Sequence, residues 1–177
     1  MIRIGILGDI GSGKSYFAKN FRYPVFNADN EVGELYKKNK EIFKKLKKAL
    51  PKYFLTFPID KNKVSEAILD NKFNLKKIIK IIHPEIRKKM NFFINKNKNK
   101  KIVILDVPLL LENKLNKKKD ILVFIQSKKS DIFKRLKKRD NFNNKLYKKF
   151  KNIQLPLDYK KKQSMFVVKN NFIKKDV

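Results

Sequence analysis

Short apolar runs separated by long basic segments organise this chain. Residues 2–7, 101–106 and 121–125 are apolar over most of their length, as strands buried on both faces of a parallel sheet are. Residues 23–29 predict a further strand that ends in an acid, with a helix following from about Asn30. These runs are far shorter than the ~18 residues that a membrane-spanning helix needs, so we expect no membrane partner.

Residues 35–100 have a helical and very basic pattern. Pro51 and Pro58 break it, and His83 with Pro84 interrupts a second helical run that resumes as far as Ile94. This segment is too long for a plain crossover between strands, so we predict that it is an inserted helical substrate-binding unit. His83 alone is compatible with a packed or capping side chain and with a ligand contact. Residues 95–100 predict a solvated loop.

The composition favours a single compact domain and excludes chemistry that depends on cysteine. The 177 residues contain no cysteine and one histidine, which excludes disulfides, iron–sulfur clusters and Cys/His zinc sites. The first ten residues contain no secretory signal, so we expect a cytoplasmic protein.

The formal net charge of +30 has two compatible explanations. Only five of the 46 basic residues are arginine, the side chain that grips phosphate oxygens with a planar fork. Lysine is instead accompanied by Asn, Ile and Phe, all with codons rich in A and T, so genome bias explains the surplus. A broad field that attracts anionic substrates explains it as well. The scarcity of arginine makes each one that remains informative.

A phosphate-binding loop follows the first strand. Residues 8–15 read G-x-x-x-x-G-K-S, between a predicted strand and a predicted helix. Its glycines allow successive backbone N–H groups to face a phosphate, and the helix N-terminus adds its positive dipole end. Lys14 is expected to reach the β- and γ-phosphates, and the Ser15 hydroxyl to ligate Mg²⁺. The loop predicts nucleoside triphosphate binding, and by itself does not separate kinase, GTPase and ATPase.

Acids at strand ends and two arginines complete the candidate chemistry. Asp29 is equally compatible with a base that accepts a hydroxyl proton and with a plain helix N-cap. Asp106 ends a buried strand, where a carboxylate supports Mg²⁺ through water. Arg135 and Arg139 are four residues apart and would share a helix face, as a phosphate clamp or as chance surface residues. Residues 141–152 are polar and basic and predict a mobile lid.

Together these motifs resemble the dephospho-coenzyme A kinase family, from Ile2 to about Asn170. Besides the loop and the paired arginines, the segments that match family motifs are residues 27–29, 59–61, 82–87, 106–112, 154–160 and 164–170. The run Asp-Val-Pro-Leu-Leu at 106–110, joined to the upstream His83-Pro84, is much more specific than the loop.

The resemblance implies ATP-dependent phosphorylation of the 3′-hydroxyl of the ribose of dephospho-CoA, the last step of coenzyme A synthesis. It implies a three-layer α/β P-loop core with about five parallel strands. Residues 1–34, 101–134 and 160–177 would form the nucleotide core, residues 35–100 the helical CoA unit, and residues 135–159 the lid. The partners expected are ATP and dephospho-CoA with Mg²⁺ and no nucleic acid, in a monomer or weak homo-oligomer.

The resemblance also favours Asp29 as the base and assigns site residues. The implied catalytic residues are Asp29, Lys14, Arg135 and Arg139. The implied ATP-binding residues are Gly8, Gly11, Ser12, Gly13, Lys14, Ser15, Tyr16 and Asn170, the last near adenine. The implied substrate-binding residues are Asp29, Asp60, Lys61, His83, Pro84, Arg87, Pro108, Leu109 and Leu110. The implied metal-binding residues are Ser15 and, through water, Asp106.

Four positions depart from the family pattern. Asp9 replaces a glycine, so its carboxylate must point away from the phosphates. Asn27 replaces an acid, Lys61 an arginine and Met165 an aspartate. Two rival functions remain: another small-molecule kinase of the same architecture, and a basic nucleic-acid-binding ATPase.

Overall fold

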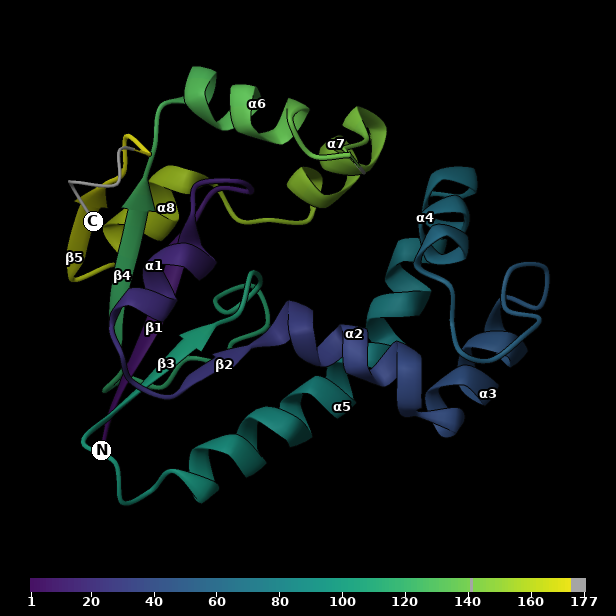
Figure 1. The fold of residues 1–177 in the computed structure, drawn as a ribbon, viewed down its shortest axis with the longest axis horizontal. Coiled ribbons are helices and arrows are strands. Elements are labelled where there is room, and N and C mark those ends of the chain that lie inside the picture. Colours follow the sequence, from purple (N-terminus) through teal and green to yellow (C-terminus); the bar gives the residue numbers. More distant parts are fainter. Residues whose placement is uncertain (141, 173–177) are drawn as a thin grey trace. The chain divides into compact units, whose positions relative to one another are not determined.

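The computed structural model describes residues 1–140 and 142–172 as five strands and eight helices (Figure 1). In chain order these are β1 (Ile2–Gly8), α1 (Lys14–Asn20), β2 (Val25–Asn27), α2 (Ala28–Lys38), α3 (Lys40–Ala49), α4 (Lys61–Asp70), α5 (Asn74–Lys96), β3 (Ile102–Asp106), β4 (Ile121–Gln126), α6 (Lys129–Lys137), α7 (Asn144–Asn152), α8 (Leu157–Lys162) and β5 (Phe166–Lys169).

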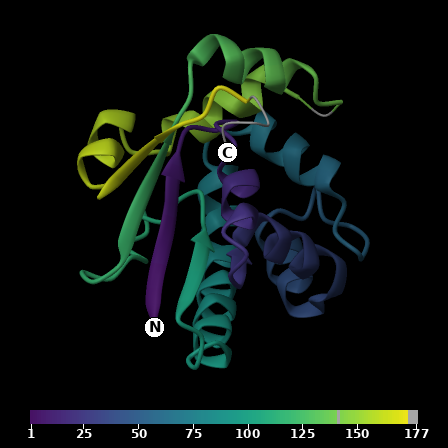
Figure 2. The same ribbon diagram turned by 60° about the vertical axis from the view of Figure 1, so that its left-hand side comes forward.

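The five strands form one parallel sheet in the order β2-β3-β1-β4-β5 (Figure 2). The apolar runs of the sequence supply its centre, and β1 lies between β3 and β4 with six of its seven residues buried. Because the strands are parallel, the loop after β1 and the acid that ends β3 lie at the same edge of the sheet. The predicted fold class is confirmed.

Each face of the sheet is covered by different residues. On one face, Ala18 and the partly buried Phe17 of α1, with Phe21 just after the helix, pack with a cluster that includes Ile4 and Ile6. Gly5 alternates to the other face, where a side chain on it would collide with Leu110 and Leu122. The segment that follows β3 therefore sits directly on β1, and α8 also packs against this strand. The result is a three-layer arrangement.

The chain divides into two compact units, a sheet unit (Met1–Asn27 and Phe93–Val177) and a helical unit (Ala28–Phe92). The helical unit thus begins and ends several residues before the expected limits of 35 and 100. The reason is that α2 belongs with α3 and α5: the N–H of Ile59 donates to the carbonyl of Tyr36, and Glu31 pairs with Lys89 at 2.8 Å.

Two expectations about local structure are wrong. The strand predicted over 23–29 ends at Asn27, and Asp29 lies in the first turn of α2, so it is neither a strand end nor an N-cap. Pro84 does not interrupt a helix, because α5 runs through it. The buried positions Ile82 and Ile86 continue the same helical spacing on both sides of Pro84, and this packing outweighs the ~3 kcal/mol that an internal proline costs.

Burial of Tyr36 is expected to lower the stability of the folded chain at alkaline pH. Its side chain is buried in α2, and burial raises the pKa of its phenol to about 12. In the unfolded chain the phenol of this tyrosine ionises near pH 10. The folded state therefore loses stability as the pH rises from 10 towards 12, and little stability is lost below pH 10. Between pH 9 and pH 11 we expect a loss of about 1.3 kcal/mol from this residue.

The comparison that isolates this effect is with Tyr36→Phe. The lysines of the two proteins titrate alike, so urea unfolding at both pH values gives the contribution of Tyr36 as the difference between them. Equal losses in the two proteins would contradict the prediction.

No helix in residues 1–140 and 142–172 combines the length and the apolar character needed to cross a bilayer.

Candidate functional site

The loop between β1 and α1 has the backbone geometry of an anion cradle. Gly8, Gly11 and Gly13 all have positive φ, and Ser12 between them is wholly buried. Gly13, with φ of +93°, is the N-cap residue of α1, and a side chain here would collide with the amide of Asn170. Glycine is therefore required at this position for the backbone conformation and for space.

Lys14 is held over this loop by the loop's own carbonyls. Its Nζ donates hydrogen bonds to the carbonyl oxygens of Asp9 at 2.7 Å and Gly8 at 3.3 Å. Ser15 and Tyr16 follow in the first turn of α1 and are exposed. An ammonium group, exposed donors and a helix N-terminus are thus gathered at one place, which suits a polyanionic ligand.

The carboxylate of Asp9 is buried and turned towards α7. Its Oδ1 accepts hydrogen bonds from the N–H of Ile10 at 2.7 Å and from Nζ of Lys151 at 2.6 Å. The expectation that this departure from the family pattern points away from the phosphates agrees with these contacts. Sequence reasoning missed Lys151, because 142 residues separate it from Asp9.

Asn170 supports the loop from the end of β5. Its side-chain nitrogen donates to the carbonyl of Ser12 at 2.9 Å, and its oxygen accepts from the N–H of Phe172 at 2.9 Å. Ser127 donates to the same carbonyl of Ser12 at 3.1 Å. Both ends of the buried Asn170 amide are engaged by the protein, so the structure gives it the task of fixing the loop. A contact with adenine stays a prediction.

Arg135 lies beside the loop, and Arg139 is placed differently from expectation. The guanidinium of Arg135 stacks on the ring of Phe172 at 4.4 Å, and its Nη1 is 3.5 Å from the position that a Cβ of Gly13 would occupy. Burial, and then the charge of Arg139, lower the pKa of Arg135. Helix α6 ends at Lys137, so Arg139 is exposed beyond it and the two arginines do not share a regular helix face.

Asp106 is oriented by the departure at position 27. The two residues are register partners in β3 and β2, and the Asn27 amide donates to Oδ2 of Asp106 at 2.6 Å. A carboxylate at position 27 would repel the Asp106 carboxylate, whereas the Asn27 amide donates a hydrogen bond that holds Asp106 in place. Within the described residues no group of three or more acids or histidines is suited to a metal ion. One carboxylate and one hydroxyl still fit Mg²⁺, which keeps several waters and takes phosphate oxygens.

The segment after β3 is tied to α8 by a buried ion pair. Nζ of Lys160 lies 2.6 Å from Oε1 of Glu112, with the two side chains 1% and 10% exposed. The same Oε1 accepts from the N–H of Leu155 at 3.0 Å, and Lys160 also donates to Gln154 at 3.2 Å. Both residues lie in matched family motifs, but the sequence alone gave no reason to pair them.

One residue of this segment that was predicted to contact substrate packs in the core. Leu110 is fully buried against Gly5 and belongs to the core. Pro108 and Leu109 are partly exposed and remain predicted contacts.

The other predicted substrate residues lie in the helical unit. Asp60 caps α4, accepting from the N–H of Asn62 at 2.8 Å, and Lys61 follows it. His83 and Arg87 are one turn apart on α5 with Pro84 between them, and Asp29 lies in α2.

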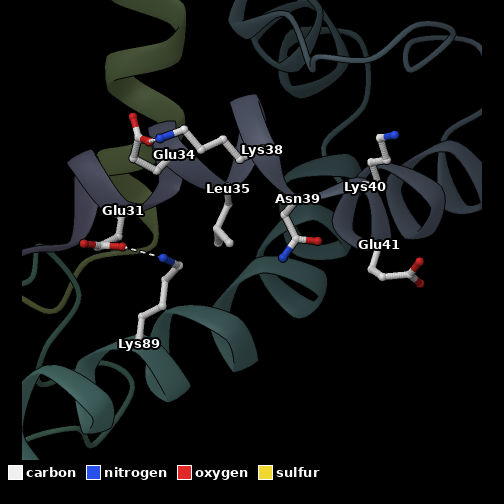
Figure 3. Close-up of a pocket in the computed structure, with 8 residues that line it drawn as sticks. All are labelled: Glu31, Glu34, Leu35, Lys38, Asn39, Lys40, Glu41 and Lys89. Atoms are coloured by element: carbon white, nitrogen blue, oxygen red, sulfur yellow. Dashed lines mark ion pairs between the residues drawn. The ribbon is translucent and has the colours of Figure 1, made fainter.

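This unit also contains a surface pocket, which none of the predicted site residues lines (Figure 3). Acids and lysines of α2, α3 and α5 form its walls, and the Glu31–Lys89 pair crosses it.

Comparison with known proteins identifies the chain's relatives. A family model described as dephospho-CoA kinase matches residues 2–176. The chain is 34% identical to the dephospho-CoA kinase of Wolbachia sp. subsp. Brugia malayi (strain TRS), over 98% of this chain and 91% of the relative. The crystal structure of TT1252 from Thermus thermophilus matches with a TM-score of 0.76 and 25% identity, over 99% of this chain and 91% of that one. A dephospho-CoA kinase from Campylobacter jejuni shares the fold, with a TM-score of 0.64 and 22% identity over 98% and 90% of the two chains.

Proposed function

We propose, from its membership of the dephospho-CoA kinase family, that the chain transfers the γ-phosphoryl group of ATP to the ribose 3′-hydroxyl of dephospho-CoA. The chain belongs to this family, which uses ATP in the final step of coenzyme A synthesis. The observation that carries this proposal is the phosphate loop itself, with Lys14 over it and Arg135 beside it. The rival nucleic-acid-binding ATPase accounts for none of the family motifs outside this loop.

The phosphate chain of ATP would occupy the loop. Its oxygens would replace the carbonyls of Gly8 and Asp9 as partners of Lys14 and accept hydrogen bonds from the loop N–H groups. Arg135, with a fixed guanidinium plane on Phe172, would stabilise charge on the phosphoryl group as it moves. Arg139 would add a second positive charge beside it.

Asp29 would accept the proton of the attacking ribose hydroxyl. It lies two residues after Asn27, at the start of α2, and the family motif at 27–29 supports the assignment. Asp60, Lys61, His83, Pro84 and Arg87 would bind dephospho-CoA, together with Pro108 and Leu109.

Mg²⁺ would be held by the Ser15 hydroxyl and, through water, by Asp106. When bound, it supplies positive charge that neutralises the β- and γ-phosphate oxygens. The amide of Asn27 would keep the Asp106 carboxylate in place for this task.

The test is incubation of the purified protein with Mg²⁺, ATP and dephospho-CoA, with ADP release followed and the product identified by mass. We expect one CoA for each ADP released. ATP binding without CoA formation would overturn the acceptor assignment and favour another small-molecule kinase. ATP hydrolysis stimulated by nucleic acid would favour the second rival.

A further inference from the structure

The second residue of the phosphate loop brings a buried negative charge into a site for polyanions. The Asp9 side chain is 7% exposed, and its Oδ1 bonds to Nζ of Lys151 and the N–H of Ile10. A carboxylate so little exposed to water acts on neighbouring charges through a low effective dielectric constant. Without a partner it would oppose the binding of phosphate groups.

The helix that supplies the partner, α7, lies at the surface and contacts the rest of the sheet unit through aromatic side chains as well. Tyr147 of α7 packs against Phe133 at 5.3 Å and Phe142 at 6.3 Å between ring centres. Within the part of the chain that the structure describes, no side chain of α7 is fully buried. Burial, and then the charge of Asp9, raise the pKa of Tyr147, so the Asp9 carboxylate acts on two residues of this helix. The contact between Asp9 and Lys151 thus joins this helix directly to the phosphate loop.

We propose that Lys151 neutralises Asp9 and thereby keeps the loop able to bind a nucleoside triphosphate. Lys151 is in this view a positioning residue that acts through Asp9 and is not itself a phosphate ligand. The proposal rests on the proposed function, because it takes the phosphates of ATP to occupy the loop.

The backbone of Asp9 makes the coupling local. Its carbonyl oxygen accepts from Lys14 at 2.7 Å, while its side chain accepts from Lys151 at 2.6 Å. Asp9 thus contacts two ammonium groups: that of Lys14, which is proposed to bind the phosphates, and that of Lys151, which neutralises the Asp9 carboxylate. With Lys151 in place the pair is neutral, and the charge of Lys14 acts undiminished on the ligand.

A double-mutant cycle in ATP affinity tests this directly. The Kd of Mg·ATP is measured calorimetrically for the unaltered chain, K151M, D9N and D9N/K151M. Asn at 9 keeps an oxygen for the N–H of Ile10 and removes the charge. We expect K151M to weaken binding about tenfold, D9N to bind at least as tightly as the unaltered chain, and the double variant to return to within about threefold of D9N.

The matched control is K148M, which removes the same charge from an exposed position of the same helix and is expected to change Kd less than twofold. A K151M defect that persists in the D9N background would overturn the proposal and make Lys151 a direct phosphate ligand. No defect in K151M would overturn it as well. Failure of the proposed function is seen separately, as absence of CoA from an unaltered chain that binds ATP.

Discussion

Replacement of Asp29 by asparagine is expected to lower kcat about a thousandfold while the Kd of ATP changes less than twofold. Asparagine has nearly the shape of aspartate but cannot take the proton of the ribose hydroxyl, and general bases contribute about 10²–10⁴ in rate. The residue lies in the helical unit, whereas the phosphate loop lies in the sheet unit. Loss of the base should therefore separate turnover from nucleotide binding.

The measurement combines initial rates of CoA formation with calorimetric titration of ATP. Glu31→Gln is the control, since it removes an acid from the same first turn of α2 and with it the same favourable interaction with the helix dipole. It also breaks the ion pair with Lys89, so it perturbs α2 more than Asp29→Asn by this route. A kcat for Asp29→Asn within a few fold of the unaltered chain would remove Asp29 from the role of base. A parallel loss in Glu31→Gln would show that the charge at the helix terminus or the attachment of α2 to α5, and not the proton acceptor, is responsible.

What sequence reasoning recovered depended on local signals. The strands β1, β3 and β4 are continuous apolar runs, and the phosphate loop is a contiguous motif whose glycines have local backbone reasons. Both could be predicted because neighbouring residues decide them. The scarcity of arginine was also informative: Arg135 lies beside the loop, and Arg3 makes an ion pair with Asp120 at 2.8 Å with both side chains almost fully buried.

The features that sequence reasoning missed are decided by tertiary packing. Pro84 reads as a helix breaker, and only the packed face of α5 overrides it. The resemblance predicts that Leu110 contacts substrate, yet the absence of a side chain on Gly5 leaves a space in which Leu110 is buried. The pairs Asp9–Lys151 and Glu112–Lys160 join residues far apart in the chain, and nothing in the abundant lysines marks these two as different.

The Glu112–Lys160 pair yields the largest expected effect on stability. Lys160→Met leaves the Glu112 carboxylate buried without its cation, and we expect a loss of about 3–5 kcal/mol in the free energy of unfolding. Lys38→Met is a control with the same substitution, in a pair with Glu34 that has the same 2.6 Å separation. Its lysine, however, is 77% exposed, so this substitution should cause no measurable loss of stability. Urea unfolding measures both without screening the charges.

A second variant separates two causes of this loss of stability: the unpaired charge of Glu112 and the lost packing of the Lys160 side chain. If the stranded carboxylate is responsible, Glu112→Gln combined with Lys160→Met should regain at least half of the lost stability, because the amide is neutral and still accepts from the N–H of Leu155. This double variant keeps the test decisive even where Lys160→Met alone fails to fold. A double variant no more stable than the single one would show that the aliphatic stem of Lys160, and not its charge, holds α8 to the segment after β3.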